Sequence, residues 1–177
     1  PVCTGLGFQM KIDPDLVIPD KSKSLNRGAI KVSGWDSASE DSISAMYFKG
    51  LSNHYGFSLD TPVKDLPEKI IDIILYGTGS EKIKITYERS YGNGTYLSTF
   101  EGIITNLERR YKETTSDWVK LDIESFMTNN ACPECNGARL KKDVLAVTVG
   151  KKNINEITKL SIQDALGFFG KLRLTRK

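Results

Sequence analysis

The sequence predicts an α+β fold, in which a β-hairpin and several helices are joined to a smaller segment that carries a Cys-x-x-Cys knuckle. Alternating apolar and polar residues over 82–88, followed by Gly92-Asn93-Gly94, are typical of a hairpin. Several other segments show the apolar spacing of amphipathic helices. The pair Cys132 and Cys135, separated by Pro133-Glu134, has the spacing of a metal-binding turn.

Length and composition limit the class of protein. The 177 residues allow one ordinary domain, or one compact domain with part of another. A hydrophobic fraction of 39% and a mean hydropathy of −0.32 predict a soluble globular chain with a real core. The longest apolar run, Ile70–Tyr76, is interrupted by Asp72 and is far shorter than the roughly 20 residues of a membrane span, so we expect no membrane partner.

The N-terminus and the cysteines indicate the context of the chain. Residues 1–5 contain no initiator Met and no signal-peptide pattern, so we expect an interior piece of a longer protein. Three cysteines make no even disulfide framework, which favours a reducing compartment, the cytoplasm.

The net charge of +3 hides an asymmetry along the chain. Residues 136–177 carry 10 Lys/Arg against three Asp/Glu, whereas residues 1–135 carry 15 against 19. Long-range attraction to a polyanion therefore belongs to the C-terminal quarter, and elsewhere only local basic clusters can attract phosphate.

The expected elements follow from breakers and periodicity. Residues 3–7 form turns, and about 13–28 form an extended connection. Helices are expected at 41–54, capped by Asp41 or Ser42, and at 66–76, capped by Asp65. Two strands flank a turn at 92–94, and 105–128 forms one long helix, or two with a break at 114–116. Residues 144–149 are expected as a strand, with Ile154 and Ile157 continuing the sheet, and Ser161 opens a helix through 168–169.

Cys3 is followed by Gly5 and Gly7 much as Cys135 is followed by Gly137. Cys3 therefore resembles the second half of another Cys-x-x-Cys pair, and we expect Cys3, Cys132 and Cys135 to converge on one zinc ion. Three unrelated buried cysteines are the simpler alternative. A thioredoxin-type redox pair is disfavoured, because Gly137 and Arg139 do not fit its strand-to-helix context.

Signals of catalysis are missing from the sequence. No phosphate-binding loop is present, and residues 77–80, Gly-Thr-Gly-Ser, lack its spacing and its lysine. His54 is the sole histidine and is better explained as a packed or capping side chain, and no carboxylate pair stands out as an acid/base dyad. We therefore expect no catalysis by this chain.

Two basic clusters lie among aromatic residues, a combination that suits phosphate contact and base stacking. The candidate DNA-binding residues are Arg109, Arg110 and Lys112 in the first cluster, and Lys82, Lys84 and Arg89, near Tyr87, Tyr91 and Tyr96, in the second. Because consecutive helical residues diverge by about 100°, at most two of the first three can face one partner. A solvated helix face, with Glu108 and Glu113 as neighbours, is the alternative.

Three stretches together resemble UvrA, the family of damage-recognition ATPases of bacterial nucleotide excision repair. They are residues 3–7, Cys-Thr-Gly-Leu-Gly; residues 100–114, which include Glu108-Arg109-Arg110-Tyr111-Lys112; and residues 132–140, Cys-Pro-Glu-Cys-Asn-Gly-Ala-Arg-Leu. The sequences His54-Tyr55-Gly56-Phe57 and Leu75-Tyr76-Gly77 fit the same pattern. The resemblance covers essentially the whole chain, but only an interior part of that longer protein.

The resemblance implies an organisation and a role. Residues 1–28 would begin a zinc module and a connection, 29–128 would form an insertion domain, and 129–177 would close the zinc knuckle and begin the signature-domain scaffold. Cys3, Cys132 and Cys135 would be zinc ligands, with a fourth cysteine expected just outside the chain.

The implied partners are duplex DNA with lesions and, for the full-length protein, UvrB, a second UvrA subunit, ATP and magnesium. The excess of acidic residues over 1–135 favours a minor or transient DNA contact. A structural or protein-interaction insertion is the main alternative, and a free-standing zinc enzyme is a weaker one, since no general base is evident near the cysteines.

Overall fold

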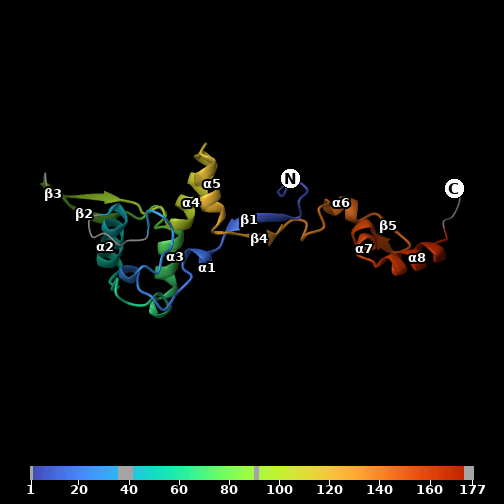
Figure 1. Ribbon diagram of the computed structural model, residues 1–177, viewed down its shortest axis with the longest axis horizontal. Helices are drawn as coiled ribbons and strands as arrows, with labels where there is room; N and C mark the ends of the chain where they lie inside the picture. Colours follow the sequence, from blue (N-terminus) through green and yellow to red (C-terminus); the bar gives the residue numbers. More distant parts are fainter. Residues whose placement is uncertain (1, 36–41, 90–91, 174–177) are drawn as a thin grey trace. The chain divides into compact units, whose positions relative to one another are not determined.

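The computed structural model describes residues 2–35, 42–89 and 92–173, and the chain divides into two compact units (Figure 1). Residues Ile12–Thr128 form one unit, which we call the inserted unit. The segments Pro1–Lys11 and Asn129–Lys177 together form the other, which we call the terminal unit. The chain passes between the two units in strands β1 (Phe8–Ile12) and β4 (Met127–Ala131), which pair with each other.

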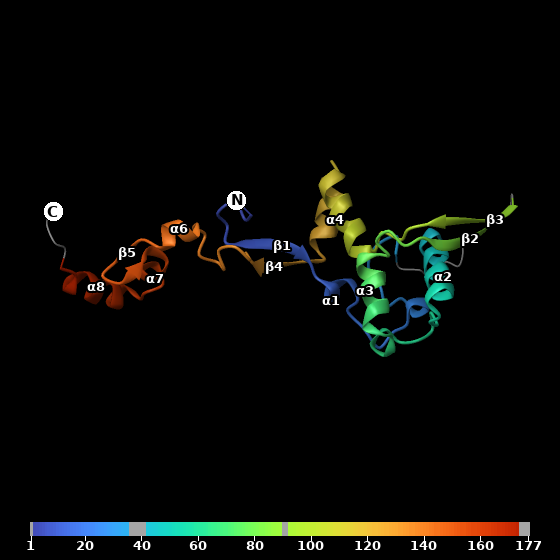
Figure 2. The same ribbon diagram turned by 180° about the vertical axis from the view of Figure 1, so that it is seen from behind.

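The described residues give the inserted unit one two-stranded sheet and several helices (Figure 2). In chain order its elements are α1 (Pro14–Val17), the 3₁₀ turn η1 (Leu25–Arg27), α2 (Ile43–Tyr55), the 3₁₀ turn η2 (Val63–Asp65), α3 (Glu68–Tyr76), β2 (Ile83–Arg89), β3 (Gly92–Ser98), α4 (Ile103–Glu113) and α5 (Asp117–Glu124). The terminal unit continues after β4 with α6 (Lys142–Leu145), β5 (Thr148–Val149), β6 (Lys152–Asn153), α7 (Ile154–Thr158) and α8 (Ile162–Lys171). The α+β class predicted from the sequence is confirmed.

The core of the inserted unit lies between α2 and the β2–β3 hairpin and continues between α3 and α4. Phe48 and Leu51 of α2 and Ile83 and Ile85 of β2 are almost completely buried. A Cβ atom on Gly50 would lie 2.7 Å from Cδ1 of Ile85, so α2 approaches the hairpin closely because this position has no side chain. The contact fixes which face of the hairpin remains exposed.

Several predicted elements are confirmed. The helix expected at 41–54 is α2, and the Ser42 hydroxyl caps it by accepting a hydrogen bond from Ala45 N–H. Gly56 ends this helix in a left-handed conformation. The two-helix alternative for 105–128 is the observed one, since α4 ends at Glu113 and α5 starts at Asp117. Ser161 caps α8 as expected.

The hairpin is confirmed, but its turn was predicted at the wrong residues. Gly92 pairs with Arg89 inside the ladder, so residues 92–94 belong to β3 and the connection falls on residues 90–91, outside the described part. A Cβ atom on Gly94 would collide with the Tyr87 ring across the strands. At Gly94, therefore, the missing side chain makes room for an aromatic ring rather than for a turn.

Local hydrogen bonds overturn four other expectations. Residues 13–28 are not extended, because Asp13 caps α1 with Pro14 in its first turn. Asp65 does not cap α3, which starts after Pro67 without a side-chain cap. Only residues 148–149 of the strand expected at 144–149 are extended, since 142–145 form α6. Asn153 and Glu156 form a reciprocal capping box, which directs Ile154 and Ile157 into α7 rather than into the sheet.

The segment expected as an extended connection also contributes to the core. Its residues Val17, Ile18 and Leu25 are buried in the core of the inserted unit.

Among the described residues, no helix has the length and apolar character needed to cross a bilayer.

Candidate metal centre and basic surfaces

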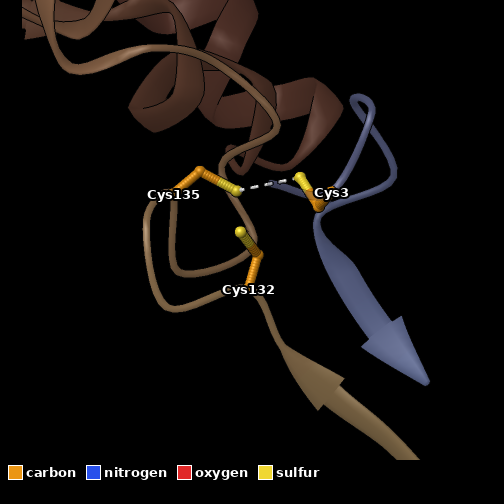
Figure 3. Close-up of side chains that lie close together, drawn as sticks. All are labelled: Cys3, Cys132 and Cys135. Atoms are coloured by element: carbon orange, nitrogen blue, oxygen red, sulfur yellow. Dashed lines mark hydrogen bonds between the residues drawn. The ribbon is translucent and has the colours of Figure 1, made fainter. Parts of the chain in front are cut away.

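The three cysteines meet in the terminal unit (Figure 3). Cys3 lies in the turn before β1, whereas Cys132 and Cys135 lie in the loop after β4. Their sulfur atoms all lie within 4.8 Å of one another, and Cys3 Sγ is 3.8 Å from Cys135 Sγ. The structure thus brings together all three cysteines that the sequence analysis selected.

The two cysteine loops have the same local conformation. Leu6 N–H donates to the Cys3 carbonyl at 2.9 Å, and Ala138 N–H donates to the Cys135 carbonyl at 2.8 Å. In each loop a Gly two residues after the cysteine has a positive φ, 87° at Gly5 and 82° at Gly137. The similarity of the two motifs in the sequence is therefore a similarity of backbone geometry.

Backbone contacts hold these loops against each other. Cys132 N–H donates to the Gly7 carbonyl at 3.0 Å. Gly7 has a φ of 82°, and a Cβ atom there would lie 2.9 Å from Cγ of Arg139 and 3.1 Å from the Gly137 carbonyl oxygen. Sequence reasoning did not assign this packing role to Arg139. The sequence feature that could have indicated this role is Gly137-Ala138-Arg139, which directly follows the knuckle of Cys132 and Cys135.

The donor set fits a tetrahedral thiolate site for zinc. Zinc–sulfur bonds of about 2.3 Å in tetrahedral geometry place two sulfur atoms about 3.8 Å apart, which agrees with the 3.8 Å between Cys3 and Cys135. All three cysteines are free of disulfide bonds. Three thiolates leave one of the four zinc positions for a further donor.

Backbone hydrogen bonds favour the ionised form of the Cys3 thiol. A backbone hydrogen bond from Gly7 is the main cause that lowers the pKa of Cys3 to about 7, with a further backbone bond from Gly5. A thiolate is the form of cysteine that binds metal, so a lowered pKa favours metal binding near neutral pH. For Cys132, a backbone bond from Cys135 lowers the pKa, but burial and the two neighbouring thiols outweigh it, and the net shift is upward.

An open pocket of about 380 Å³ adjoins the cysteines, which supply part of its wall. Its other walls include Glu134, Arg139, Lys141 and Asp143. The sulfur cluster is therefore accessible from one side to a metal ion or a chelator.

The basic residues of α4 are not equally available to a partner. Arg109 donates from Nε and Nη2 to the Glu101 carboxylate, at 2.7 Å and 3.1 Å, and from Nη1 to Glu113 at 2.8 Å. The donors of this guanidinium thus already bind two carboxylates. Arg110 is half-buried and Lys112 is exposed, and they lie about 160° apart around the helix.

The basic residues of the hairpin are better placed. Lys82 and Lys84 are exposed, while Ile83 and Ile85, which alternate with them, are buried. Both lysines therefore lie on the outer face of the hairpin. Arg89 belongs to β2, but its side chain is outside the described part, as is Tyr91.

His54 has a structural role that involves a residue the sequence analysis did not select. Its Nε2 lies 2.8 Å from Oε1 of Glu81, and the Tyr55 hydroxyl donates to Oε2 of the same carboxylate at 2.7 Å. These hydrogen bonds, chiefly the one from His54, lower the pKa of Glu81. No sequence signal links Glu81 to α2, because the contact spans 27 residues and depends on the fold.

Comparison with known proteins identifies relatives over the whole chain. Residues 13–125 match the family model described as the UvrA DNA-binding domain. The chain is 46% identical over 175 residues to UvrABC system protein A of Clostridium perfringens, covering 99% of this chain and 18% of that protein. It is 42% identical to the protein of the same name from Bacillus subtilis, covering 100% of this chain and 18% of that protein.

A solved structure shows the same fold. The crystal structure of UvrA2 from Deinococcus radiodurans matches with a TM-score of 0.62 at 21% identity, covering 96% of this chain and 21% of that one. The chain thus spans about a fifth of the length of the proteins it matches. With the model match over 13–125 and identities above 40% along its whole length, the chain belongs to the UvrA family.

Proposed function

We propose that this chain is part of a nucleotide excision repair protein, in which the inserted unit contacts duplex DNA around a lesion and the three cysteines hold a structural zinc ion. The match of residues 13–125 to the UvrA DNA-binding domain carries the proposal. The chain itself performs no catalysis. In the longer protein, which acts in the cytoplasm, ATP and magnesium bind elsewhere, and UvrB and a second UvrA subunit are partners.

The outer face of the β2–β3 hairpin is the best supported DNA contact. Lys82 and Lys84 are exposed there, and Thr86 and Thr95, which lie opposite each other, add exposed hydroxyl groups. Lysine and hydroxyl side chains bind phosphate oxygens without reading base sequence. Such a contact suits a protein that must accept many kinds of damage through the shape and deformability of the duplex. Arg110 and Lys112 lie on opposite sides of α4 and cannot join one contact, so the exposed Lys112 supplies the second contact and Arg109 stabilises the fold.

Zinc has a structural role in this proposal. Cys3 would be joined through the metal to Cys132 and Cys135, which links the two chain segments of the terminal unit. The ion would supply positive charge that stabilises the thiolates, and the backbone N–H groups around Cys3 would orient its sulfur. No reaction step is assigned to the metal.

Charge reversal in the full-length protein tests the DNA contact. Each phosphate contact contributes about −0.9 to the log–log dependence of affinity on salt, so Lys82→Glu with Lys84→Glu should flatten the slope by about 1.8 and weaken duplex binding. Lys31→Glu with Lys64→Glu is the matched control, because these lysines are also exposed in the inserted unit but belong to segments other than the hairpin. The same measurements on lesion-bearing and undamaged duplexes test discrimination.

A structural or protein-interaction role is the second candidate, favoured by the acidic balance of residues 1–135. It would replace the DNA contact if charge reversal at Lys82, Lys84, Arg110 and Lys112 left affinity, salt slope and lesion preference unchanged in a folded protein.

A further inference from the structure

A single threonine side chain joins the two legs of the β2–β3 hairpin at its base. Thr78 lies between α3 and β2 and is half-buried. Its hydroxyl donates to the Glu81 carbonyl at 2.7 Å, shortly before β2, and accepts from Phe100 N–H at 3.0 Å, shortly after β3. Its own N–H donates to the Phe100 carbonyl at 2.9 Å. The incoming leg of the hairpin is therefore bonded to the outgoing leg through one residue.

The outgoing leg is fixed in the core. Phe100 is 1% exposed, and the centroid of its ring lies 5.6 Å from that of Trp35, 5.7 Å from that of Tyr47 and 6.4 Å from that of Phe48. Close-packed aromatic rings resist displacement. The hydrogen bonds between Thr78 and the Phe100 backbone thus attach the hairpin to a rigid support.

The incoming leg has a second attachment, to the end of α2. Both oxygens of the Glu81 carboxylate contact this helix, with Oε1 2.8 Å from His54 Nε2 and Oε2 2.7 Å from the Tyr55 hydroxyl. The Glu81 side chain is 54% exposed, so water weakens this attachment relative to the threonine bridge. It directs toward α2 the carboxylate that immediately precedes Lys82 in the chain.

These contacts bear on how the hairpin presents its lysines. Lys82 and Lys84 follow Glu81 directly, and both are exposed. A hairpin with a fixed base holds both ammonium groups ready for phosphate. A hairpin that pivots at its base loses conformational freedom when it binds, and this loss lowers affinity.

We propose that Thr78 is a positioning residue for the DNA contact of the hairpin, assisted by Glu81; the inference rests on the proposed function, since it concerns the same lysines. We call Thr78 and Glu81 the hairpin clasp. The clasp touches no DNA and fixes the direction of the hairpin, so that Lys82 and Lys84 meet phosphates together. Because the lysines remain when the clasp is broken, the clasp raises affinity without changing its salt dependence.

Removal of the Thr78 hydroxyl from the intact protein tests the proposal. Thr78→Val keeps the branched shape of the side chain and should weaken binding to a lesion-bearing duplex about three- to tenfold, with a salt slope close to wild type. Thr78→Ser keeps the hydroxyl and should bind like wild type. Thr105→Val is the matched control, because it removes a hydrogen bond from the Thr105 hydroxyl to the Tyr76 carbonyl, at 3.2 Å, that does not involve the hairpin.

Two further measurements make the test independent of one variant. Without DNA, hydrogen exchange of the β2 and β3 amides should be faster in Thr78→Val than in Thr105→Val. His54→Ala with Tyr55→Phe releases Glu81 but keeps its charge, and it should also weaken duplex binding at an unchanged salt slope. If Thr78→Val does not fold, this double variant decides between a clasp and no clasp.

The outcomes distinguish a wrong clasp from a wrong DNA contact. If Lys82→Glu with Lys84→Glu flattens the salt slope but Thr78→Val binds like wild type, the clasp is overturned and the DNA contact stands. Equal losses of affinity in Thr78→Val and Thr105→Val would reflect general stability and also overturn the clasp. If the lysine reversal itself has no effect, the proposed function fails and the clasp fails with it.

Discussion

Thr4 and Asn136 have almost the same left-handed backbone conformation, with φ of 48° and 46°, although they lie 132 positions apart in the chain. Each follows a proposed zinc ligand and precedes a glycine with a φ above 80°. Such a conformation is uncommon for residues other than glycine. Its occurrence at equivalent positions indicates that the two loops are built to present sulfur to the same point.

A zinc measurement on the chain tests this geometry. Cys3→Ser, Cys132→Ser and Cys135→Ser should each reduce the zinc content of the purified protein, because a hydroxyl is a poor replacement for a thiolate ligand. Glu134→Gln is the control, since Glu134 lies between two of the cysteines and lines the same pocket without joining the sulfur cluster. Elemental analysis gives the stoichiometry, and equal zinc content in all four variants would contradict a shared site.

The sequence predicted the convergence of the three cysteines better than it predicted the fold around them. The cysteine spacing and the flanking glycines are local signals, so Cys3, Cys132 and Cys135 could be selected without knowledge of the topology. The capping by Asn153 and Glu156 is also local, but an apolar alternation with Ile154 and Ile157 competed with it. The capping hydrogen bonds decided in favour of helix.

Contacts between distant residues could not be read from the sequence. Glu113 could be named as a helix neighbour of Arg109, but nothing in the sequence indicated that Glu101, eight residues earlier, turns back to bind the same guanidinium. Gly94 looked like a turn residue, since the position of the Tyr87 ring depends on the strand register. In both cases a side chain brought near by the fold changed the role of the residue.

Replacing Gly102 should destabilise the inserted unit severely. Gly102 has a φ of 86°, and a Cβ atom there would lie against the backbone of Gly77 and 2.7 Å from Cα of Tyr76, where α3 ends. Gly56 has a φ of 72° with no atom within 4 Å of such a Cβ. Gly56 has the left-handed helical conformation, with a ψ of 38°, so Gly56→Ala should lose about 1–2 kcal/mol from backbone strain. Gly102 has a ψ of 150°, a region essentially restricted to glycine, so Gly102→Ala should lose about 1–3 kcal/mol from backbone strain and about 1–3 kcal/mol more from overpacking. Denaturant unfolding measures the difference, and equal losses would refute the close approach.

The Tyr55 phenol should ionise at unusually high pH. Burial, followed by its hydrogen bond to Glu81, raises the pKa of Tyr55 to about 12. Glu81→Gln removes the negative charge and should lower this pKa toward the ordinary value of about 10. Glu124→Gln is the control, because Glu124 accepts from Tyr111 and should lower only the pKa of Tyr111. Tyrosine ring-carbon NMR resolves the two residues, and an unchanged Tyr55 titration in Glu81→Gln would show that the carboxylate is not its partner.

The ion pair between Arg109 and Glu101 should support stability in a pH-dependent way. Hydrogen bonds from Arg109, and then from Asn106, lower the pKa of Glu101 in the folded protein. The pair therefore contributes fully above the ordinary carboxyl pKa of about 4.3 and is lost as the pH falls through the lower folded value. Arg109→Ala should reduce the unfolding midpoint at pH 7, and the difference from wild type should shrink under acidic conditions.

The same variant separates a structural arginine from a DNA contact. Because its donors already bind Glu101 and Glu113, Arg109→Ala should leave the salt slope of duplex binding close to wild type, whereas the Lys82 and Lys84 reversal flattens it. Arg109→Lys should restore little stability, since an ammonium group cannot reproduce the forked hydrogen bonds. A flattened salt slope in Arg109→Ala, with an unchanged unfolding midpoint, would instead mean that the guanidinium leaves its carboxylates to bind phosphate, and α4 would then join the hairpin as a DNA-binding element.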